Sequence, residues 1–283
     1  MKRALKFISL CTVCALAFSM IAGCSGKDAA SSSKASSSKA SSSSSSKAST
    51  SSQSASKEIV GLVENAPEVD QFAPPEQGEE IAVLEVEGYG TIKMRLFPDN
   101  APKAVENFKT LAKEGKYDGV PFHRVIKDFM IQTGDTSLNG GDGKDIWGSG
   151  FGIEVSDTLH HYSGAVAMAR TNDMKAGQSS QFYIVSNEDI QQMSDAEFDS
   201  YEAQVSASGN KLTYSDEVRK TYNEKGGAAF LDMQYTVFGQ VFEGLDVVNQ
   251  IAAVECEMGQ DGALSSPVEK VVISKAQIVA YEG

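Results

Sequence analysis

The sequence predicts a mainly β domain, folded as a closed antiparallel barrel, over residues 81–282 of a 283-residue chain. Short runs rich in β-branched and aromatic residues recur along this part: VPFHRVI, FMIQTG, GAVAMAR, SQFYIVSN and YTVFGQVFEG. Only two well-supported helical patterns accompany them. Many short strands with few helices are typical of a barrel, in which closure leaves no sheet edge exposed.

The barrel is expected to begin with a hairpin. Residues 81–97, IAVLEVEGYGTIKMRLF, hold two alternating runs around Gly88-Tyr89-Gly90. The segment that follows, NAPKAVENFKTLAKEG, carries apolar residues at helical spacing. It predicts a helix with Asn100 as its N-cap, ended by Gly115.

Two further segments complete this scheme, and one interrupts it. LDVVNQIAAVE, residues 245–255, predicts the second helix, and VEKVVISKAQIVAYEG closes the chain as a long strand. Residues 188–227 do not fit a barrel, because they hold two polar helical patterns, the first with Ser194 and Glu197 as a capping box. We therefore predict a helical insertion between two strands.

The N-terminal residues read as an export signal. Three basic residues precede an apolar run from Phe7 to Ala22, which is too short and wrongly flanked for a transmembrane helix. Ile21-Ala22-Gly23-Cys24 resembles the bacterial lipobox, so we expect residues 1–23 to be removed and Cys24 to be lipidated. The alternative is an ordinary signal peptide in which Cys24 is incidental.

Residues 24–80 are predicted to be a disordered tether. Ser25 to Lys57 consist almost wholly of Ser, Ala and Lys, with little to bury, and Glu58 to Glu80 are acidic and contain proline. A flexible chain of the length of Ser25 to Lys57 reaches about 30 Å. We expect a domain held at the extracytoplasmic face of a cell membrane. A Gram-positive cell is favoured, because a long Ser-rich tether suits a surface without an outer membrane.

Charge argues against one class of partner, and cysteine content argues against a disulfide. Residues 58–283 hold 17 basic and 37 acidic residues, which disfavours nucleic acid as a partner. Only Cys256 lies in this part of the chain, so stability must come from the core rather than from a disulfide. We expect a monomer.

One stretch raises a chemical question. In FHRVIKDFMIQTGD, residues 122–135, Arg124 alternates with Phe122 and Ile126, and Gln132 follows two places after Met130. Alternate residues of a strand share a face, so a guanidinium and an amide would lie among apolar side chains. Arg124 alone could be an ordinary exposed arginine at a strand end.

The stretch resembles the signature of cyclophilins, the cyclosporin-binding peptidyl-prolyl isomerases. Two further similar motifs follow in order, GAVAMARTNDMKAGQSSQFYIV and FLDMQYTVFGQVFEGLDVV. The resemblance covers residues 80–282, apart from the insertion. It implies an eight-stranded antiparallel barrel capped by two helices, with proline-containing segments of exported, folding proteins as substrates.

The resemblance also implies a site. Arg124 would donate to the prolyl nitrogen, and Gln132 would hold the substrate carbonyl or position Arg124. The backbone of Arg170 would pair with the peptide, and Phe122 would pack close by. The remaining substrate-binding residues would be Phe129, Met130, Tyr183, Phe230, Leu231 and Tyr235. Because rotation about a bond breaks none, no metal or cofactor is expected.

Four of these positions depart from the best-known cyclophilin pattern. Tyr183 replaces a common Phe, Tyr235 a His and Arg170 an Asn, while Phe230 replaces the Trp associated with tight cyclosporin binding. We expect activity to survive and drug sensitivity to be weak. The adjacent His160 and His161 are expected to be surface residues, because no carboxylate or Cys falls at a recognisable ligand spacing.

Two other functions stay open. A peptide-binding holdase or adhesion module could use the same groove without relevant turnover, and the insertion favours added binding. A solute-binding lipoprotein would share the lipobox and tether, but it would need a two-domain α/β pattern that this strand-rich body lacks.

Overall fold

The computed structural model describes residues 61–138, 143–187 and 189–283. The predicted signal peptide, Cys24 and residues 25–60 of the tether lie outside the described residues. Residues Glu58–Gly283 form one compact unit. Within the described ranges, no helix has the length and apolar character needed to cross a membrane.

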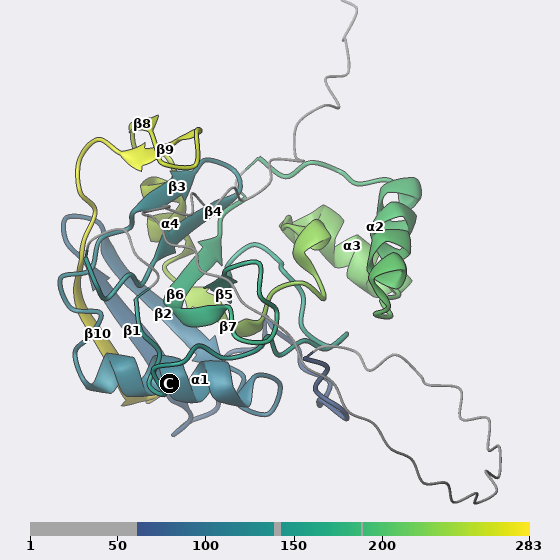
Figure 1. Ribbon diagram of the computed structural model, residues 1–283, viewed down its shortest axis with the longest axis horizontal. Helices are drawn as coiled ribbons and strands as arrows, with labels where there is room; N and C mark the ends of the chain where they lie inside the picture. The colour runs from purple at the N-terminus through teal and green to yellow at the C-terminus, as the bar shows by residue number, and fades with distance from the viewer. Residues whose placement is uncertain (1–60, 139–142, 188) are drawn as a thin grey trace, which may run out of the picture. The chain divides into compact units, whose positions relative to one another are not determined.

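Eight strands form one antiparallel sheet in the order β10-β1-β2-β7-β5-β6-β4-β3 (Figure 1). Their bounds are β1 Glu80–Val86, β2 Gly90–Leu96, β3 Arg124–Ile126, β4 Met130–Thr133, β5 Ala165–Arg170, β6 Gln178–Val185, β7 Val237–Glu243 and β10 Ile273–Ala280. β8, Cys256–Met258, and β9, Leu264–Pro267, make a separate hairpin. The predicted hairpin is confirmed, with Val86 opposite Gly90 across a turn in which Gly88 has a φ of 76°.

The sheet is curled but open, so the prediction of a closed barrel was wrong. Among the described residues, no ladder joins β3 to β10. The two edges meet only through the isolated bridge Pro121–Val272 and neighbouring hydrogen bonds, such as Phe122 N to Val271 O at 2.8 Å. Proline has no N–H to give to a ladder, and β3 is only three residues long. The eight antiparallel strands themselves are as expected.

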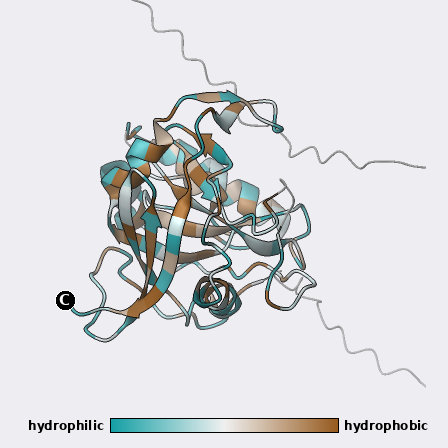
Figure 2. Cartoon of the chain, turned by 90° about the vertical axis from the view of Figure 1, so that its left-hand side faces the viewer, coloured by the Kyte–Doolittle hydropathy of each residue, from teal (hydrophilic) through white to brown (hydrophobic). Residues whose placement is uncertain are grey.

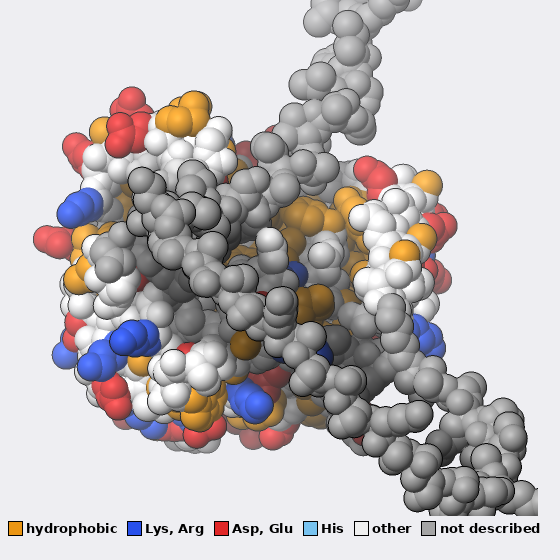
Figure 3. Space-filling model, in the orientation of Figure 1, with side chains coloured by type: hydrophobic (Ala, Val, Ile, Leu, Met, Phe, Trp, Pro, Cys, Tyr) orange, Lys and Arg blue, Asp and Glu red, His pale blue; other side chains and the backbone are white. Residues whose placement is uncertain are grey.

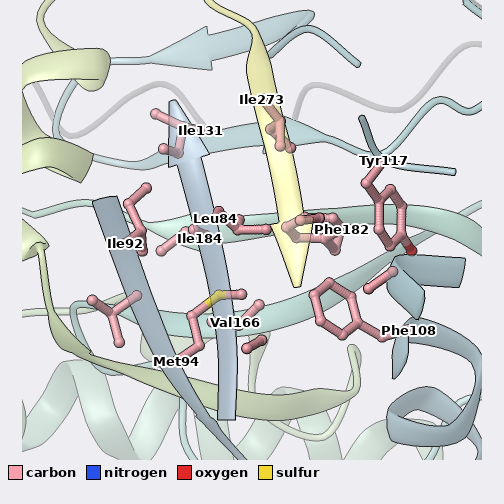
Figure 4. Packing of buried hydrophobic residues seen from close by; sticks show 14 of the residues in the cluster. Leu84, Ile92, Met94, Phe108, Tyr117, Ile131, Val166, Phe182, Ile184 and Ile273 are labelled. Atoms are coloured by element: carbon pink, nitrogen blue, oxygen red, sulfur yellow. The ribbon is translucent and has the colours of Figure 1, made fainter. Parts of the chain in front are cut away.

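Two helices cover the main hydrophobic core of the sheet. α1, Pro102–Lys113, contacts β6 and β10, and α4, Leu245–Ala252, contacts β2, β3 and β4. Figure 4 shows Phe108 of α1 against Tyr117 and Phe182, whose ring centroids lie 5.3 and 5.2 Å from its own. Figure 2 shows hydrophobic and hydrophilic residues interspersed along the strands, as expected for a sheet with one face on the core.

The start of α1 differs from the prediction. Asn100 does not cap it: its side chain donates to Pro67 O and Thr158 Oγ1, both at 2.9 Å. The first N–H groups of the helix are satisfied instead by Glu154, whose carboxylate accepts from Lys103 N at 3.0 Å and Ala104 N at 2.9 Å. Such a cap is local in space but not in sequence, so a capping pattern cannot reveal it.

The helical insertion is confirmed. It contains α2, Asp195–Ser208, and α3, Asp216–Lys225, at the right of Figure 1. The Ser194–Glu197 capping box is present, with Ser194 N donating to Glu197 Oε2 at 2.8 Å. The short helix η1, Ala229–Leu231, follows and leads toward β7. The insertion packs against the domain through a third hydrophobic cluster, whose aromatic members include Phe198, Tyr214, Tyr222 and Tyr162.

The prediction that residues 61–80 belong to the tether was wrong. Gln71 is only 3% exposed, and its side chain donates to His160 O at 3.0 Å and accepts from His160 N at 2.7 Å. Leu62 pairs with Val155 in an isolated parallel bridge. Composition misses such a segment because it is held by side-chain hydrogen bonds to a distant backbone rather than by an apolar pattern. Residues 61–80 are part of the domain.

Candidate active site

Arg124 and Gln132 are brought together by the β3–β4 pairing. They are directly opposite each other in the ladder, and Met130 is opposite Ile126. Met130 and Gln132 therefore share a face of β4 with Arg124. Arg124 Nη1 lies 3.5 Å from Gln132 Oε1 and 3.6 Å from Met130 Sδ. The sequence pattern predicted that Gln132 and Met130 share a face, and Arg124 and Ile126 likewise, but it also placed Phe122 there, which was wrong.

A third residue, Asp261, fixes the guanidinium. Arg124 Nε donates to Asp261 Oδ2 at 2.7 Å. Asp261 lies in the β8–β9 turn, where its other oxygen accepts from Ser265 Oγ at 2.7 Å and Ala263 N at 3.0 Å. Burial alone would raise the pKa of Asp261, but the hydrogen bonds from Arg124 and Ser265 outweigh it and leave that pKa below its ordinary value. The sequence analysis missed this residue, for which Asp261-Gly262 offers only a turn signal.

Gln132 is held from its other side. Its Nε2 donates to Gln181 Oε1 at 2.8 Å, and the Gln132 residue is only 9% exposed. The contacts therefore run from Asp261 through Arg124 and Gln132 to Gln181. Each amide and the guanidinium have a partner, which limits the number of orientations they can adopt.

A group of apolar side chains lies beside the polar row formed by Asp261, Arg124, Gln132 and Gln181. We use "apolar wall" for five predicted residues that belong to the second hydrophobic cluster: Phe129, Met130, Tyr183, Leu231 and Tyr235. Phe230 borders it, with its ring centroid 5.7 Å from that of Phe129, and is 37% exposed. Figure 3 shows hydrophobic side chains between the body of the sheet and the insertion. Phe122 lies elsewhere, in the main core.

Arg170 packs against Tyr235 of the apolar wall. The guanidinium carbon of Arg170 lies 4.4 Å from the centroid of the Tyr235 ring, within the range of a cation–π contact. Arg170 Nε donates to Gln234 O at 2.8 Å. These contacts occupy the side chain of Arg170, while the resemblance assigned a role to its backbone.

The expectation that His160 and His161 are surface residues was wrong. They are 5% and 1% exposed, and the Nδ1 atom of each lies within 2.9 Å of the carboxylate of Asp232. Asp232 lies 71 positions beyond His161 in the chain, so no spacing rule points to the pair. Among the described residues, no group of three or more His, Cys, Asp or Glu side chains could hold a metal ion.

Comparisons with known proteins agree with this geometry. The family described as "Cyclophilin type peptidyl-prolyl cis-trans isomerase/CLD" matches residues 81–278. A Staphylococcus epidermidis protein named "Putative peptidyl-prolyl cis-trans isomerase" is 38% identical over 202 residues, covering 71% of this chain and 93% of that protein. A Staphylococcus aureus protein of the same name is 37% identical over 203 residues, covering 72% of this chain and 93% of its own.

A solved structure is also similar. The crystal structure of a Cryptosporidium parvum cyclophilin type peptidyl-prolyl cis-trans isomerase, in the presence of the dipeptide Ala-Pro, gives a TM-score of 0.51 at 23% identity. It covers 71% of this chain and 99% of that one, and shows that the two share a fold. The fold is thus that of a cyclophilin. The chain belongs to the cyclophilin-type peptidyl-prolyl cis-trans isomerase family, and it is an enzyme of that type.

Proposed function

We propose that Arg124 is the catalytic donor of this isomerase, and that its substrates are exported proteins folding near a membrane. The observation that carries the first part is the fixed guanidinium: Arg124 is bound through Nε to Asp261, with its side chain 21% exposed beside the apolar wall. A donor held in place before the substrate arrives needs no reorganisation in the transition state.

The reaction explains why an arginine is suited to this place. Amide resonance gives rotation about an X–Pro bond a barrier of about 20 kcal/mol. In the twisted amide the prolyl nitrogen becomes pyramidal and gains a lone pair. A hydrogen bond to that nitrogen stabilises the twisted state more than the planar one, which is the requirement for acceleration. Arginine is always charged and presents a rigid set of donors.

The other residues bind and orient the substrate in this proposal. The apolar wall and Phe230 receive the prolyl ring, and keep water from weakening the contact with Arg124. Gln132 holds the substrate carbonyl or keeps Arg124 in place, and the backbone of Arg170 pairs with the extended peptide. Reaching a rate of roughly a thousand per second requires the barrier to fall by about 6–7 kcal/mol. One charged hydrogen bond together with orientation is sufficient for that.

The place of action follows from the N-terminal sequence. A basic start, an apolar run and the lipobox-like residues before Cys24 support lipid attachment at the extracytoplasmic face of a membrane. The test is cell fractionation of the full chain and of Cys24→Ser. The full chain should be found with membranes and the variant should not; equal partition of both would reject the lipid anchor.

The catalytic role is tested on the unit from Glu58, with tetrapeptides that differ in the residue before proline. Arg124→Ala should lose most of the acceleration, and Arg124→Lys should recover little of it because it lacks the fork of donors. Arg95→Ala is the matched control: its side chain is also 21% exposed, and its Nε is also paired with a carboxylate, Glu79, at 2.9 Å. If parent and Arg124→Ala are both inert yet bind proline peptides, the domain is a binding module.

A further inference from the structure

The insertion and the apolar wall meet at one buried carboxylate. Asp232 follows η1 directly and is 2% exposed. Its Oδ1 accepts from His161 N at 2.9 Å and lies 2.7 Å from His161 Nδ1. Its Oδ2 accepts from Tyr222 of α3 at 2.7 Å and lies 2.9 Å from His160 Nδ1. Four donors saturate both oxygens.

The charge of Asp232 fixes which atoms donate to it. Burial would raise the pKa of Asp232, but His160 and His161 outweigh it and hold that pKa well below its ordinary value. Because an ionised carboxylate only accepts, Nδ1 of His161 must carry a proton. In the neutral ring the opposite nitrogen, Nε2, is then an acceptor.

Tyr183 of the apolar wall is hydrogen-bonded to that nitrogen, and it is the donor when the ring is neutral. Its hydroxyl lies 3.0 Å from His161 Nε2, and the two rings are nearly parallel, with an interplanar angle of 13°. Burial raises the pKa of Tyr183 well above its usual value, so the phenol stays protonated and donates. This hydrogen bond therefore fixes the position of the hydroxyl end of the Tyr183 side chain.

The insertion also holds η1 directly. Tyr214 donates its hydroxyl to Ala229 O at 2.8 Å, and the Tyr201 ring lies 6.3 Å from that of Phe230. η1 carries Phe230 and Leu231, two residues assigned to the proline site. Together with the hydrogen bond from Tyr222 to Asp232, these contacts hold η1 against the insertion.

We propose that His161, Asp232 and Tyr222 are positioning residues of the proline site. They hold the Tyr183 ring and the η1 turn in the geometry that accepts a prolyl ring, so the insertion sets how tightly substrate binds. This inference rests on the proposed function, and adds that the insertion is a functional part of the site. Buried hydrogen-bond networks act as a unit, so a change at Tyr222 should reach Tyr183.

The test compares three single variants and one double variant of the full chain. Tyr222→Phe and Tyr183→Phe each remove one hydroxyl from the network and keep the ring. Tyr117→Phe is the matched control, because Tyr117 is fully buried and donates to Ser180 O at 3.0 Å, within the main core. The measurements are KM and kcat with a proline tetrapeptide, together with the melting temperature of each variant.

We expect Tyr222→Phe and Tyr183→Phe each to raise KM about fivefold with a smaller effect on kcat. The KM of the double variant should not exceed the higher of the two single-variant values, because both changes interrupt the same connection. Tyr117→Phe should lower the melting temperature and leave KM within about twofold. KM unchanged in Tyr222→Phe, or effects that multiply in the double variant, would overturn the proposal.

Two outcomes need their own readouts. If Tyr222→Phe does not fold, Tyr214→Phe takes its place, because it removes the insertion's hydrogen bond to Ala229 O and leaves the residues of the apolar wall unchanged. KM unchanged in Tyr214→Phe would then overturn the proposal. If the parent chain binds peptide without accelerating isomerisation, the catalytic proposal fails by itself. The dissociation constant of the tetrapeptide, measured by calorimetry, then replaces KM in the same comparison.

Discussion

Arg124 and Asp261 lie 137 positions apart in the chain, and a 2.7 Å hydrogen bond joins Nε of the one to Oδ2 of the other. The bond uses the donor nearest the side-chain stem. A different nitrogen, Nη1, lies on the side of Gln132 and Met130. In this arrangement the carboxylate orients the arginine rather than competing for the nitrogens that would face a substrate.

Removing that carboxylate should slow catalysis more than it weakens binding. We expect Asp261→Ala to lower kcat about tenfold, since a charge-assisted hydrogen bond contributes about 1.5–3 kcal/mol. Asp261→Asn keeps an oxygen that can accept from Nε, so it should recover part of the loss. Steady-state kinetics on both variants give the comparison. Equal kcat for Asp261→Ala and the parent would mean that Arg124 is positioned by other contacts.

The sequence was sufficient for the parts of the fold that depend on local periodicity. The hairpin at residues 81–97 and the two core helices follow from alternation and helical spacing, and both are present. The insertion was visible for the same reason, since Ser194 and Glu197 satisfy the helix end within one turn. The position of Gln132 on one face with Met130 followed from the period of a strand, whereas the pairing of Gln132 with Arg124 is seen only in the structure.

The features that the sequence did not reveal are contacts between residues that lie far apart in the chain. Glu154 caps α1 in place of Asn100, Gln71 bonds the backbone of His160, and Asp232 buries two histidines that were expected at the surface. Each of these contacts joins segments that only the folded sheet brings together. The open edge of the sheet is a related case, because it depends on Pro121 meeting β10.

The pH dependence expected for kcat/KM follows from side chains whose charge does not change near neutral pH. Arg124 is always protonated. The pKa of Asp261 is below its ordinary value of about 3.9, so the pair stays ionised above about pH 4. Burial lowers the pKa of the adjacent His123, which is therefore neutral above about pH 6.5.

We accordingly expect kcat/KM to vary less than about twofold between pH 6.5 and 8.5, and to fall below about pH 4 as Asp261 becomes protonated. The profile is measured with one tetrapeptide in buffers of constant ionic strength. A sigmoidal change with its midpoint inside the upper range would instead indicate a titrating group in the mechanism. It would argue against a purely electrostatic role for the arginine.

The cap on α1 is a separate prediction about stability. Glu154→Ala leaves the N–H groups of Lys103 and Ala104 without their carboxylate. It should cost about 1–2 kcal/mol in the free energy of unfolding, or about 3–6 °C in melting temperature. Glu154→Gln keeps one acceptor oxygen and should lie between the two. Thermal unfolding followed by circular dichroism measures both, and a shift below about 1 °C in Glu154→Ala would show that the helix does not depend on this cap.

Cyclosporin sensitivity tests the border of the apolar wall. Phe230 is 37% exposed, with its ring 5.7 Å from that of Phe129 and 6.3 Å from that of Tyr201. In the cyclophilins that this sequence resembles, a Trp at this position accompanies tight drug binding. An indole adds apolar area and one N–H donor. Phe230→Trp should therefore lower the inhibition constant for cyclosporin about tenfold from a weak starting value, with KM measured in parallel.

The Tyr201 side chain decides how a negative result is interpreted. It comes from α2 and lies beside Phe230, so it could occupy the space that a larger ring or the drug requires. The double variant Phe230→Trp/Tyr201→Ala removes that obstacle. Tight inhibition only in the double variant would attribute the expected weak inhibition of the parent to the insertion. Weak inhibition in both the single and the double variant would attribute the weak inhibition instead to the apolar wall, where Tyr183 and Tyr235 also depart from the family pattern.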